Sequence, residues 1–286
     1  MKLILLFIPI VTCCNILSMS GGGAFGAIEI GILDELVSTK QIPPFFDVIT
    51  GISAGGLNAG ILSFFNDIPT ALPNLIDMYS TIRNSDIYYV SINNWSIYNN
   101  SPLEKTLNMF LQLLSIPKYP PVVIIGATNL YTEELDIFVV NNMSLSEKID
   151  ILMSTTAIPI IFPPRKYNNT LYVDGGLISN EIINQVMGFI DCNYYNITYI
   201  SARPKHDINN ITNVVSYISA LIRTLFTTFD SQLAQMTKCA YPKGEINACF
   251  PTDPVLGKFN MLDFDHGKEL YVSGKRNHKC IKYSLC

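Results

Sequence analysis

The sequence has few charged residues and few groups that bind metals. Only 15% of its 286 residues are Asp, Glu, Lys or Arg, and the formal net charge is −4. The basic residues form no run, so bulk charge indicates neither a nucleic-acid partner nor attraction to an anionic membrane. The chain has three histidines and no C-x-x-C pair, which argues against a zinc site. A neutral or interfacial substrate fits this composition at least as well as a charged one.

Internal repeats and Pro/Gly/Ser-rich linkers are also absent, so nothing in the sequence divides the chain into separate domains. Hydrophobic residues make up 49% of the chain, which is enough to bury a large core. Strand-like and helix-like segments alternate, which predicts a three-layer α/β/α sandwich with a mainly parallel central sheet. We expect a single domain over residues 15–286.

The apolar run at the start of the chain, residues 1–14, is too short to cross a bilayer as a helix. Its length and its single positive charge are typical of a signal peptide, although no small-x-small cleavage site is visible. The alternative is an additional buried strand or helix. A signal peptide would direct the protein to the secretory pathway, whereas without one we expect a cytoplasmic or peripheral-membrane location.

Cysteines and glycosylation sequons bear on the same question. If the chain enters the secretory pathway, we expect disulfides among the four C-terminal cysteines. Sequons add limited support for that route, because the chain is rich in asparagine. The cysteines are Cys239, Cys249, Cys280 and Cys286, and the sequons begin at Asn94, Asn142, Asn168, Asn196 and Asn210.

Local patterns predict the elements around the motifs. Strands are expected at 16–20, 45–50, 122–125, 171–173 and 197–200, with 135–140 as a hairpin partner. Helices are expected at 25–37 and 57–65, from a capping box at Ser144 to before Pro159, and at 214–229. Glu29 and Glu35 lie off the apolar stripe of the first helix. Residues 66–118 are expected to form helices and loops that cover the sheet.

The motif Gly51-Ile52-Ser53-Ala54-Gly55 lies between an expected strand and an expected helix. In this G-x-S-x-G pattern the serine occupies a strained turn, and the flanking glycines let neighbouring backbone pass without Cβ clashes. Such a turn exposes the hydroxyl at the carboxyl edge of the sheet. The context favours this interpretation over an ordinary strand-to-helix turn, so Ser53 is a candidate nucleophile.

A second glycine motif, Ser20-Gly21-Gly22-Gly23-Ala24-Phe25-Gly26, joins the first expected strand to the first expected helix. Consecutive glycines before a helix present unobstructed N–H groups, and the helix start adds partial positive charge. These groups suit the oxyanion of acyl transfer. The segment also matches the dinucleotide fingerprint G-x-G-x-x-G. That alternative requires an acidic residue at the end of the second strand, whereas Asp47 begins that strand.

The third motif, Asp174-Gly175-Gly176, follows the strand expected at 171–173. An aspartate at the carboxyl end of a strand, with glycines removing steric cover, can accept a serine proton. The alternative is an aspartate that caps its own turn. The presence of the two other motifs favours Asp174 as a general base.

Together and in this order, the three motifs make the chain resemble the patatin-like phospholipases. The resemblance covers residues 16–183, includes Gly126–Asn129 and Thr155–Pro164, and is thin beyond residue 185. It implies a Ser53–Asp174 dyad without histidine that hydrolyses fatty-acyl esters of membrane or micellar lipid, with no metal or cofactor. It also implies an oxyanion hole at Gly21, Gly22 and Gly23. Supporting motif positions are Gly26, Gly51, Gly55, Gly175 and Gly176.

Two alternatives to the dyad enzyme stay open. The order Ser53–Asp174–His206 also matches an α/β-hydrolase triad, although that fold places its oxyanion glycines after a third strand. The family usually has a basic residue at the position of Phe25. This departure is the reason for the second alternative, a lipid-binding protein that keeps the fold and has lost catalytic turnover.

The sequence indicates neither the lipid head group nor the acyl length, the positional preference or the oligomeric state. Several aromatic residues suit an interfacial lid and the core equally well: Phe64, Phe65, Tyr88, Tyr89 and Trp95.

Overall fold

A computed structural model describes residues 13–92, 95–190, 192–203, 217, 220, 243–253 and 258–285. Residues 1–12 of the expected leader, His206 and all but two positions of the helix expected at 214–229 lie outside these ranges. Cys239, Cys286 and the sequon residues Asn94 and Asn210 also lie outside them.

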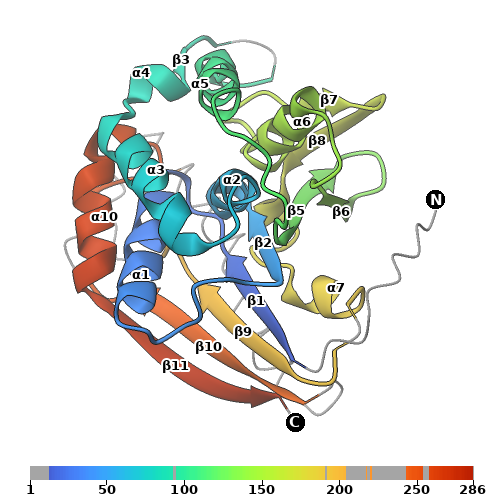
Figure 1. Ribbon diagram of the computed structural model, residues 1–286. Helices are drawn as coiled ribbons and strands as arrows, with labels where there is room; N and C mark the ends of the chain where they lie inside the picture. The colour runs from blue at the N-terminus through green and yellow to red at the C-terminus, as the bar shows by residue number, and fades with distance from the viewer. Residues whose placement is uncertain are drawn as a thin grey trace.

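Five parallel strands form the centre of a nine-stranded sheet, in the order β10-β9-β1-β2-β5 (Figure 1). Antiparallel strands extend both edges: β11 pairs with β10, β6 and β8 pair with β5, and β7 pairs with β8. The predicted mainly parallel sheet is therefore confirmed. The bounds are β1 (Cys14–Met19), β2 (Val48–Ile52), β5 (Val122–Asn129), β6 (Glu134–Val139), β7 (Arg165–Tyr167), β8 (Thr170–Asp174), β9 (Tyr195–Ile200), β10 (Gly244–Pro251) and β11 (His278–Leu285).

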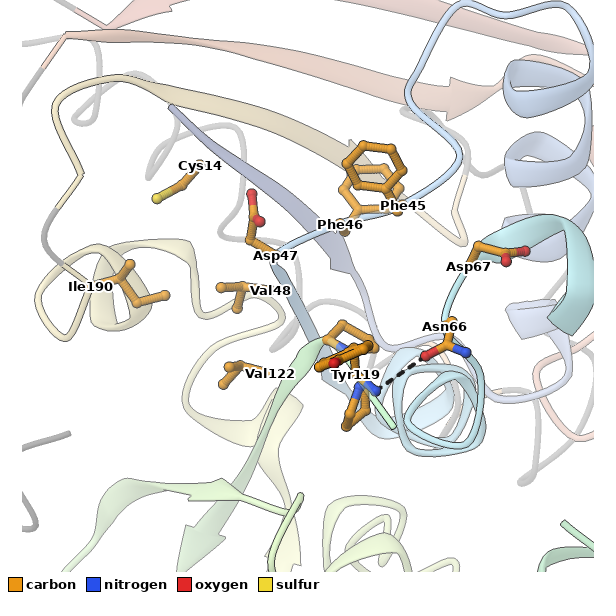
Figure 2. A pocket seen from close by; sticks show the side chains of 12 residues that line it. Cys14, Phe45, Phe46, Asp47, Val48, Asn66, Asp67, Tyr119, Val122 and Ile190 are labelled. Carbon is orange, nitrogen blue, oxygen red and sulfur yellow. Dashed lines mark hydrogen bonds between the residues drawn. The ribbon is translucent and has the colours of Figure 1, made fainter. Parts of the chain in front are cut away.

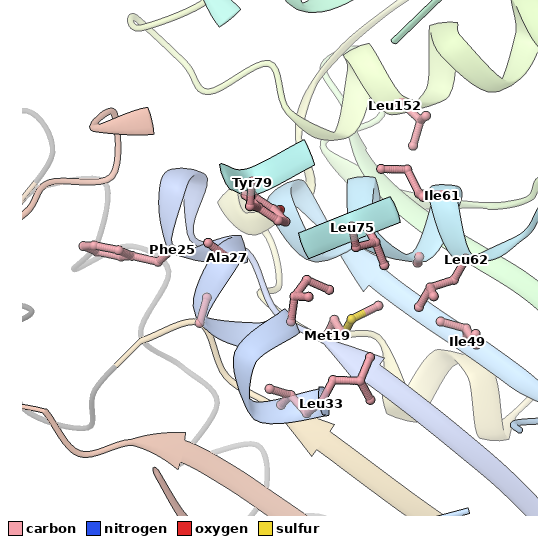
Figure 3. Packing of buried hydrophobic residues seen from close by; sticks show 14 of the residues in the cluster. Met19, Phe25, Ala27, Leu33, Ile49, Ile61, Leu62, Leu75, Tyr79 and Leu152 are labelled. Atoms are coloured by element: carbon pink, nitrogen blue, oxygen red, sulfur yellow. The ribbon is translucent and has the colours of Figure 1, made fainter. Parts of the chain in front are cut away.

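Each face of the sheet has its own hydrophobic cluster, because successive strand residues point to opposite faces. In β1, Leu17 and Met19 belong to the first cluster, whereas Cys14 and Ile16 belong to the second, which α7 (Ile183–Met187) covers. Figure 3 shows the first cluster between the sheet and its helices. These helices are α1 (Gly26–Ser38), α2 (Ser53–Leu62), α3 (Ile68–Thr81), α5 (Ser101–Leu111), α6 (Leu145–Thr155) and α10 (Gly267–Arg276).

Smaller elements fill the long connection between α3 and β5. Helix α4 (Asn84–Ile87) leads into a two-stranded hairpin of β3 (Tyr89–Val90) and β4 (Tyr98–Asn99), and α5 follows. Short 3-10 turns, η1 (Gly23–Phe25), η2 (Gly175–Leu177) and η4 (Phe264–His266), complete the described elements. Among the helices in the described ranges, none has both the length and the apolar character needed to cross a membrane.

Most of the predicted elements are confirmed, but the helix expected at 57–65 begins at Ser53, and the strand expected at 45–50 begins at Val48. The capping box begins α6: Glu147 N–H donates to Ser144 Oγ at 3.3 Å, and Ser144 N–H donates to Glu147 Oε2 at 2.8 Å. The strand expected at 45–50 begins only at Val48, which pairs with Ile16 of β1. Phe45 lies before the first residue of β2 that pairs with β1, so it has no partner on that strand. Its side chain is 56% exposed.

Within the described ranges, two disulfides fix the sheet and its surroundings. Cys249–Cys280 joins directly opposed residues of β10 and β11 and falls among the cysteines expected to pair. Cys14–Cys192 joins the start of β1 to the segment before β9. Cys14, the last residue of the expected leader, is thus the first residue of β1 and part of the folded sheet.

Replacing both Cys14 and Cys192 with serine should lower the free energy of unfolding by about 2–5 kcal/mol. The reason is that this disulfide links residues 178 positions apart and so restricts the unfolded chain. Urea unfolding followed by circular dichroism measures the change. The control is Cys13→Ser, because Cys13 has a free, exposed thiol. Equal unfolding midpoints for the double variant and the control would contradict the prediction.

Candidate active site

Ser53 lies at the junction of β2 and α2. Its backbone has a φ of +52°, a left-handed conformation that is rare for a residue with a side chain. The flanking glycines are required by close backbone approach. A Cβ on Gly51 would lie 2.1 Å from the carbonyl oxygen of Gly55, and a Cβ on Gly55 would lie 2.4 Å from that of Met19. This geometry is that of a nucleophile elbow.

Strand β5 brings Asp174 to Ser53 by changing partners along its length. Its first part pairs with β2, which ends with Ile52 opposite Gly126. The next residue of β5, Ala127, pairs with Asp174 at the end of β8. The residue that follows Ile52 and the last residue of β8 therefore lie beside the same point of β5.

The Asp174 carboxyl is fully buried. Its Oδ1 accepts from Gly176 N–H at 2.8 Å, whereas Oδ2 has no partner in full hydrogen-bond geometry within the described ranges. Burial raises the pKa of Asp174 to about 7, and the Ser53 hydroxyl, the Gly176 N–H and the Arg203 charge limit that rise. A carboxyl that titrates near neutral pH and faces a serine hydroxyl can act as a general base.

Thr155 connects the elbow to β5. Its Oγ1 accepts from Ser53 N–H at 2.8 Å and donates to the Gly126 carbonyl oxygen at 2.6 Å. The hydroxyl thereby holds the backbone of Ser53 in its strained conformation. In the sequence, Thr155 is recognisable only as part of the segment Thr155–Pro164 that resembles the family. A single threonine does not indicate a hydrogen bond to a backbone N–H distant in sequence.

The glycine loop between β1 and α1 lies against the elbow. A Cβ on Gly21 would lie 3.0 Å from Ser53 Cβ. Gly21 N–H donates to Asn180 Oδ1 at 3.0 Å, and Asn180 Nδ2 donates back to the Gly21 carbonyl oxygen at 3.4 Å. The N–H groups of Gly22 and Gly23 form no hydrogen bond within the described part of the chain. Of the three predicted oxyanion donors, Gly21 is therefore the one already engaged.

A buried carboxyl group accepts a hydrogen bond from the backbone at the start of this loop. Glu29, expected off the apolar stripe of its helix, is completely buried in α1. Its Oε1 accepts from Ser20 N–H at 2.8 Å, and its Oε2 accepts from Asn58 Nδ2 at 3.0 Å. Burial raises the pKa of Glu29 well above its usual range, while the bonds from Asn58 and Ser20 oppose this rise. The apolar stripe of the helix did not predict this burial, because hydrogen-bond donors inside the protein, and not water, satisfy the carboxyl oxygens of Glu29.

The position where the resemblance implies a basic residue is apolar. Phe25 is 2% exposed and belongs to the first hydrophobic cluster, at its edge beside α1 (Figure 3). A positive charge that acts on Asp174 comes from Arg203, which follows β9 and is largely buried. Arg203 lies beyond the span of the resemblance, so the motifs could not indicate it.

A separate pocket lies at the amino ends of the parallel strands, opposite the ends beside which Ser53 lies. Its volume is about 540 Å³, and the first residues of β1, β2 and β5 (Cys14, Val48 and Val122) line it together with Phe46 and Tyr119 (Figure 2). Ligands of parallel α/β sheets bind at the carboxyl ends of the strands, which is where Ser53 lies. The elbow, and not this pocket, therefore lies at the end of the sheet where such ligands bind.

Comparison with known proteins agrees with the arrangement of these motifs. A family model described as patatin-like phospholipase matches residues 17–187. Probable lipid hydrolase 463L of Invertebrate iridescent virus 6 is 28% identical over 178 residues, covering 57% of this chain and 60% of that protein. The cGAMP-activated phospholipase of Escherichia coli (strain TW11681) is 30% identical over 199 residues, covering 58% and 53%. Patatin-12 of Solanum tuberosum is 28% identical over 190 residues, covering 57% and 49%.

The chain thus spans only about half the length of the curated relatives that it matches. The family match nevertheless includes the glycine loop, the elbow and the aspartate motif, and it extends over more than half of this chain. The chain belongs to the patatin-like phospholipase family.

Proposed function

We propose that this protein is a lipid acyl hydrolase that cleaves fatty-acyl esters of phospholipids through Ser53 and Asp174. Membership of the family supports lipid ester hydrolysis. The observation that carries the finer proposal is the pairing of β5, first with β2 and then with β8. This pairing sets a buried carboxyl beside a serine in a strained turn. Membrane or micellar lipid is the corresponding substrate form.

In the proposed reaction, Asp174 accepts the Oγ proton as Ser53 Oγ forms a bond to the ester carbonyl carbon. The carbonyl oxygen becomes an oxyanion, which N–H groups of the glycine loop stabilise. When the tetrahedral intermediate collapses, the bond to the alcohol breaks and the alcohol leaves with the proton from Asp174. Water then attacks the acyl-enzyme and transfers a proton to Asp174. The fatty acid leaves as Ser53 recovers its hydrogen.

The three glycines have different tasks in this proposal. Gly22 and Gly23 offer N–H groups that no hydrogen bond within the described ranges occupies. Gly21 contributes when its N–H exchanges Asn180 Oδ1 for the oxyanion. One lost donor at such a site typically costs a factor of about 10²–10³ in kcat.

A serine-directed fluorophosphonate probe tests whether Ser53 is an activated nucleophile. We expect the folded protein to form a covalent adduct on Ser53, located by peptide mass spectrometry, and to release fatty acid from phosphatidylcholine. Heat-denatured protein is the control, because the elbow and the base no longer meet in it. An unlabelled Ser53 in protein that binds lipid without releasing fatty acid would support the lipid-binding alternative that Phe25 motivates.

Replacement of His206 by Gln distinguishes the dyad from the triad. With a dyad, turnover should stay within a factor of about ten of the wild type, whereas loss of a triad histidine lowers it by several orders of magnitude. The two other histidines are matched controls, because each has a hydrogen-bond partner outside the dyad. His266 Nδ1 lies 2.7 Å from Asp263 Oδ1, and His278 Nδ1 lies 3.0 Å from the Gly274 carbonyl oxygen.

A further inference from the structure

Four large apolar side chains are exposed close together. Val90, Ile92 and Trp95 belong to the β3–β4 hairpin and are 70%, 82% and 63% exposed. Ile160, in the turn after α6, is 57% exposed. Large apolar side chains exposed as a group mark an interaction surface more often than single exposed ones do.

Main-chain bonds join the two segments that carry this group. Ile97 N–H donates to the Ile160 carbonyl oxygen at 2.9 Å, and Tyr98 N–H donates to that of Ile161 at 3.0 Å. Ile160 has a φ of +70°, which is an outlier for a β-branched residue. In this conformation more than half of the Ile160 side chain is exposed to solvent. Such strain is typical of functional surfaces.

Neither segment carries a charge. Residues 87–103 and 151–164 contain no Asp, Glu, Lys, Arg or His, although 15% of the chain is charged. A Trp and neighbouring Tyr residues beside aliphatic side chains suit the boundary between water and lipid. A zwitterionic lipid surface offers no net charge that needs pairing, so it is complementary to this surface. A nucleic acid or a strongly charged protein is not.

The base of the hairpin, at Tyr88 and Tyr98, is firmly packed. Tyr88 donates its hydroxyl to the Leu262 carbonyl oxygen at 2.9 Å. The Tyr88 ring centroid lies 4.7 Å from that of Tyr98, 6.0 Å from that of Phe162 and 6.3 Å from that of Phe264. Val90, Ile92 and Trp95 are therefore presented beside a fixed support, which lowers the ordering cost of binding.

The same turn reaches the dyad. Ala157, three residues before Ile160, accepts from Asp174 N–H through its carbonyl oxygen at 3.0 Å. Thr155, just before it, holds the Ser53 backbone. Figure 1 shows α4, β3 and α5 on the side of the molecule toward which β1 and β2 point. The exposed group and the elbow thus share the carboxyl end of the sheet.

We infer that Val90, Ile92, Trp95 and Ile160 form a docking surface that seats on a zwitterionic phospholipid interface and presents the elbow to it. This inference rests on the proposed lipid hydrolase function and adds the form in which its substrate is recognised. The five aromatic residues that suit a lid and the core equally well divide accordingly, and Phe65 is partly buried against the first hydrophobic cluster. Phe64 is buried and Tyr88 anchors the hairpin, whereas Tyr89 and Trp95 face solvent.

The test is flotation of the full chain with phosphatidylcholine vesicles that contain no anionic lipid. The double variant Ile92→Glu/Trp95→Glu should lower the partition coefficient at least about tenfold, because burying a carboxylate in an apolar interface is unfavourable. The control is Phe189→Glu, which changes an aromatic residue that follows α7 and is 65% exposed. This control should change binding by less than about twofold, since isolated exposed side chains contribute little.

Kinetics separate docking from folding. The double variant should lose far more activity on micellar phospholipid than on a short-chain ester below its micellar concentration, and Trp95→Phe should keep vesicle binding. Equal losses on both substrates, undiminished vesicle binding, or binding that appears only with anionic lipid would each overturn the inference. So would a glycan on Asn94 of the native protein, since it would hold the hairpin away from lipid.

Failure of the proposed function gives a different result. In that case no ester is cleaved and Ser53 is not labelled, whatever the vesicle binding shows. Failure of the docking surface leaves Ser53 reactive and ester cleavage intact, but makes vesicle binding independent of Ile92 and Trp95.

Discussion

Ser53→Ala should lower kcat/KM on phospholipid by about 10⁴-fold or more, because a lost nucleophile leaves only binding and oxyanion contacts to catalyse hydrolysis. The change removes one oxygen and keeps the N–H that donates to Thr155 Oγ1. The fold should therefore be retained, which thermal unfolding checks. Fatty acid release from purified protein measures the loss. If the alanine variant hydrolysed phospholipid at the wild-type rate, another nucleophile would have to be sought.

Ser53→Gly is the matched variant for the backbone. Ser53 has a φ of +52°, where a Cβ is unfavourable and glycine is not. The glycine variant should therefore be as inactive as the alanine variant but more stable, by about 1 kcal/mol, since relief of such strain is worth about 1–3 kcal/mol and added unfolded-state entropy offsets part of it. Urea unfolding of the two variants measures the difference. Equal stability would show that the elbow stores no strain.

Motifs with a fixed local geometry were the part of the site that could be predicted. Gly51, Ser53 and Gly55 lie in one turn, and a Cβ on Gly51 would lie 2.1 Å from the Gly55 carbonyl oxygen. The run Gly21-Gly22-Gly23 follows the first strand directly. Both patterns are recognisable because their residues are close in sequence, although most atoms that a Cβ on Gly55 or on the glycine run would meet belong to residues distant in sequence.

Residues that act through long-range contacts could not be predicted. Asn180 reaches Gly21 across 159 positions, and Thr155 reaches Ser53 across 102 positions. Neither residue type is distinctive, and nothing local requires either contact. Glu29 shows the converse case. Its helical position indicates a solvated side chain, and only the surrounding Ser20 and Asn58 make its burial acceptable.

The fold was predictable for a related reason. Strands buried on both faces consist of continuous apolar runs, as in Val122–Ile125, and alternation with helices implies parallel pairing. The antiparallel pairing of β5 with β8 had no such signal. That pairing determines where Asp174 lies, so the motif order indicated the base whereas its position required the structure.

Asp174→Asn should lower kcat/KM by about 10³–10⁴-fold, because an amide cannot accept the Ser53 proton. The wild-type rate should rise with pH and level off above pH 7, since burial raises the pKa of Asp174 to about 7 and only the ionised form is a base. Arg203→Met should shift this limb to higher pH, because the Arg203 charge favours the ionised carboxylate. A pH–rate profile of kcat/KM measures both effects. A profile that is flat between pH 5 and 8 would exclude Asp174 as the base.

The same substitution should stabilise the fold, and the sign follows from the direction of the pKa shift. The folded-state pKa of Asp174, about 7, lies above the ordinary aspartate value of 3.8, so the folded protein holds the proton more tightly than the unfolded chain. Stability from this group is complete below pH 3.8 and is lost as pH rises through 7. Asparagine avoids the burial of a charge, and its oxygen can still accept from Gly176 N–H.

The gain of Asp174→Asn in unfolding free energy should therefore increase by about 2–3 kcal/mol between pH 5 and pH 8, since each pH unit between the two pKa values changes it by about 1.4 kcal/mol. Urea unfolding at the two pH values measures it. Asp136→Asn is the control, because this carboxylate accepts from Tyr172 and Asn129 in a less buried position. If the gain in unfolding free energy did not increase with pH, burial would not be destabilising the ionised form of Asp174. If the ionised Asp174 carboxylate destabilises the fold, then accepting a proton lowers the free energy of the folded protein. The proposed activation of Ser53 requires this property of its base.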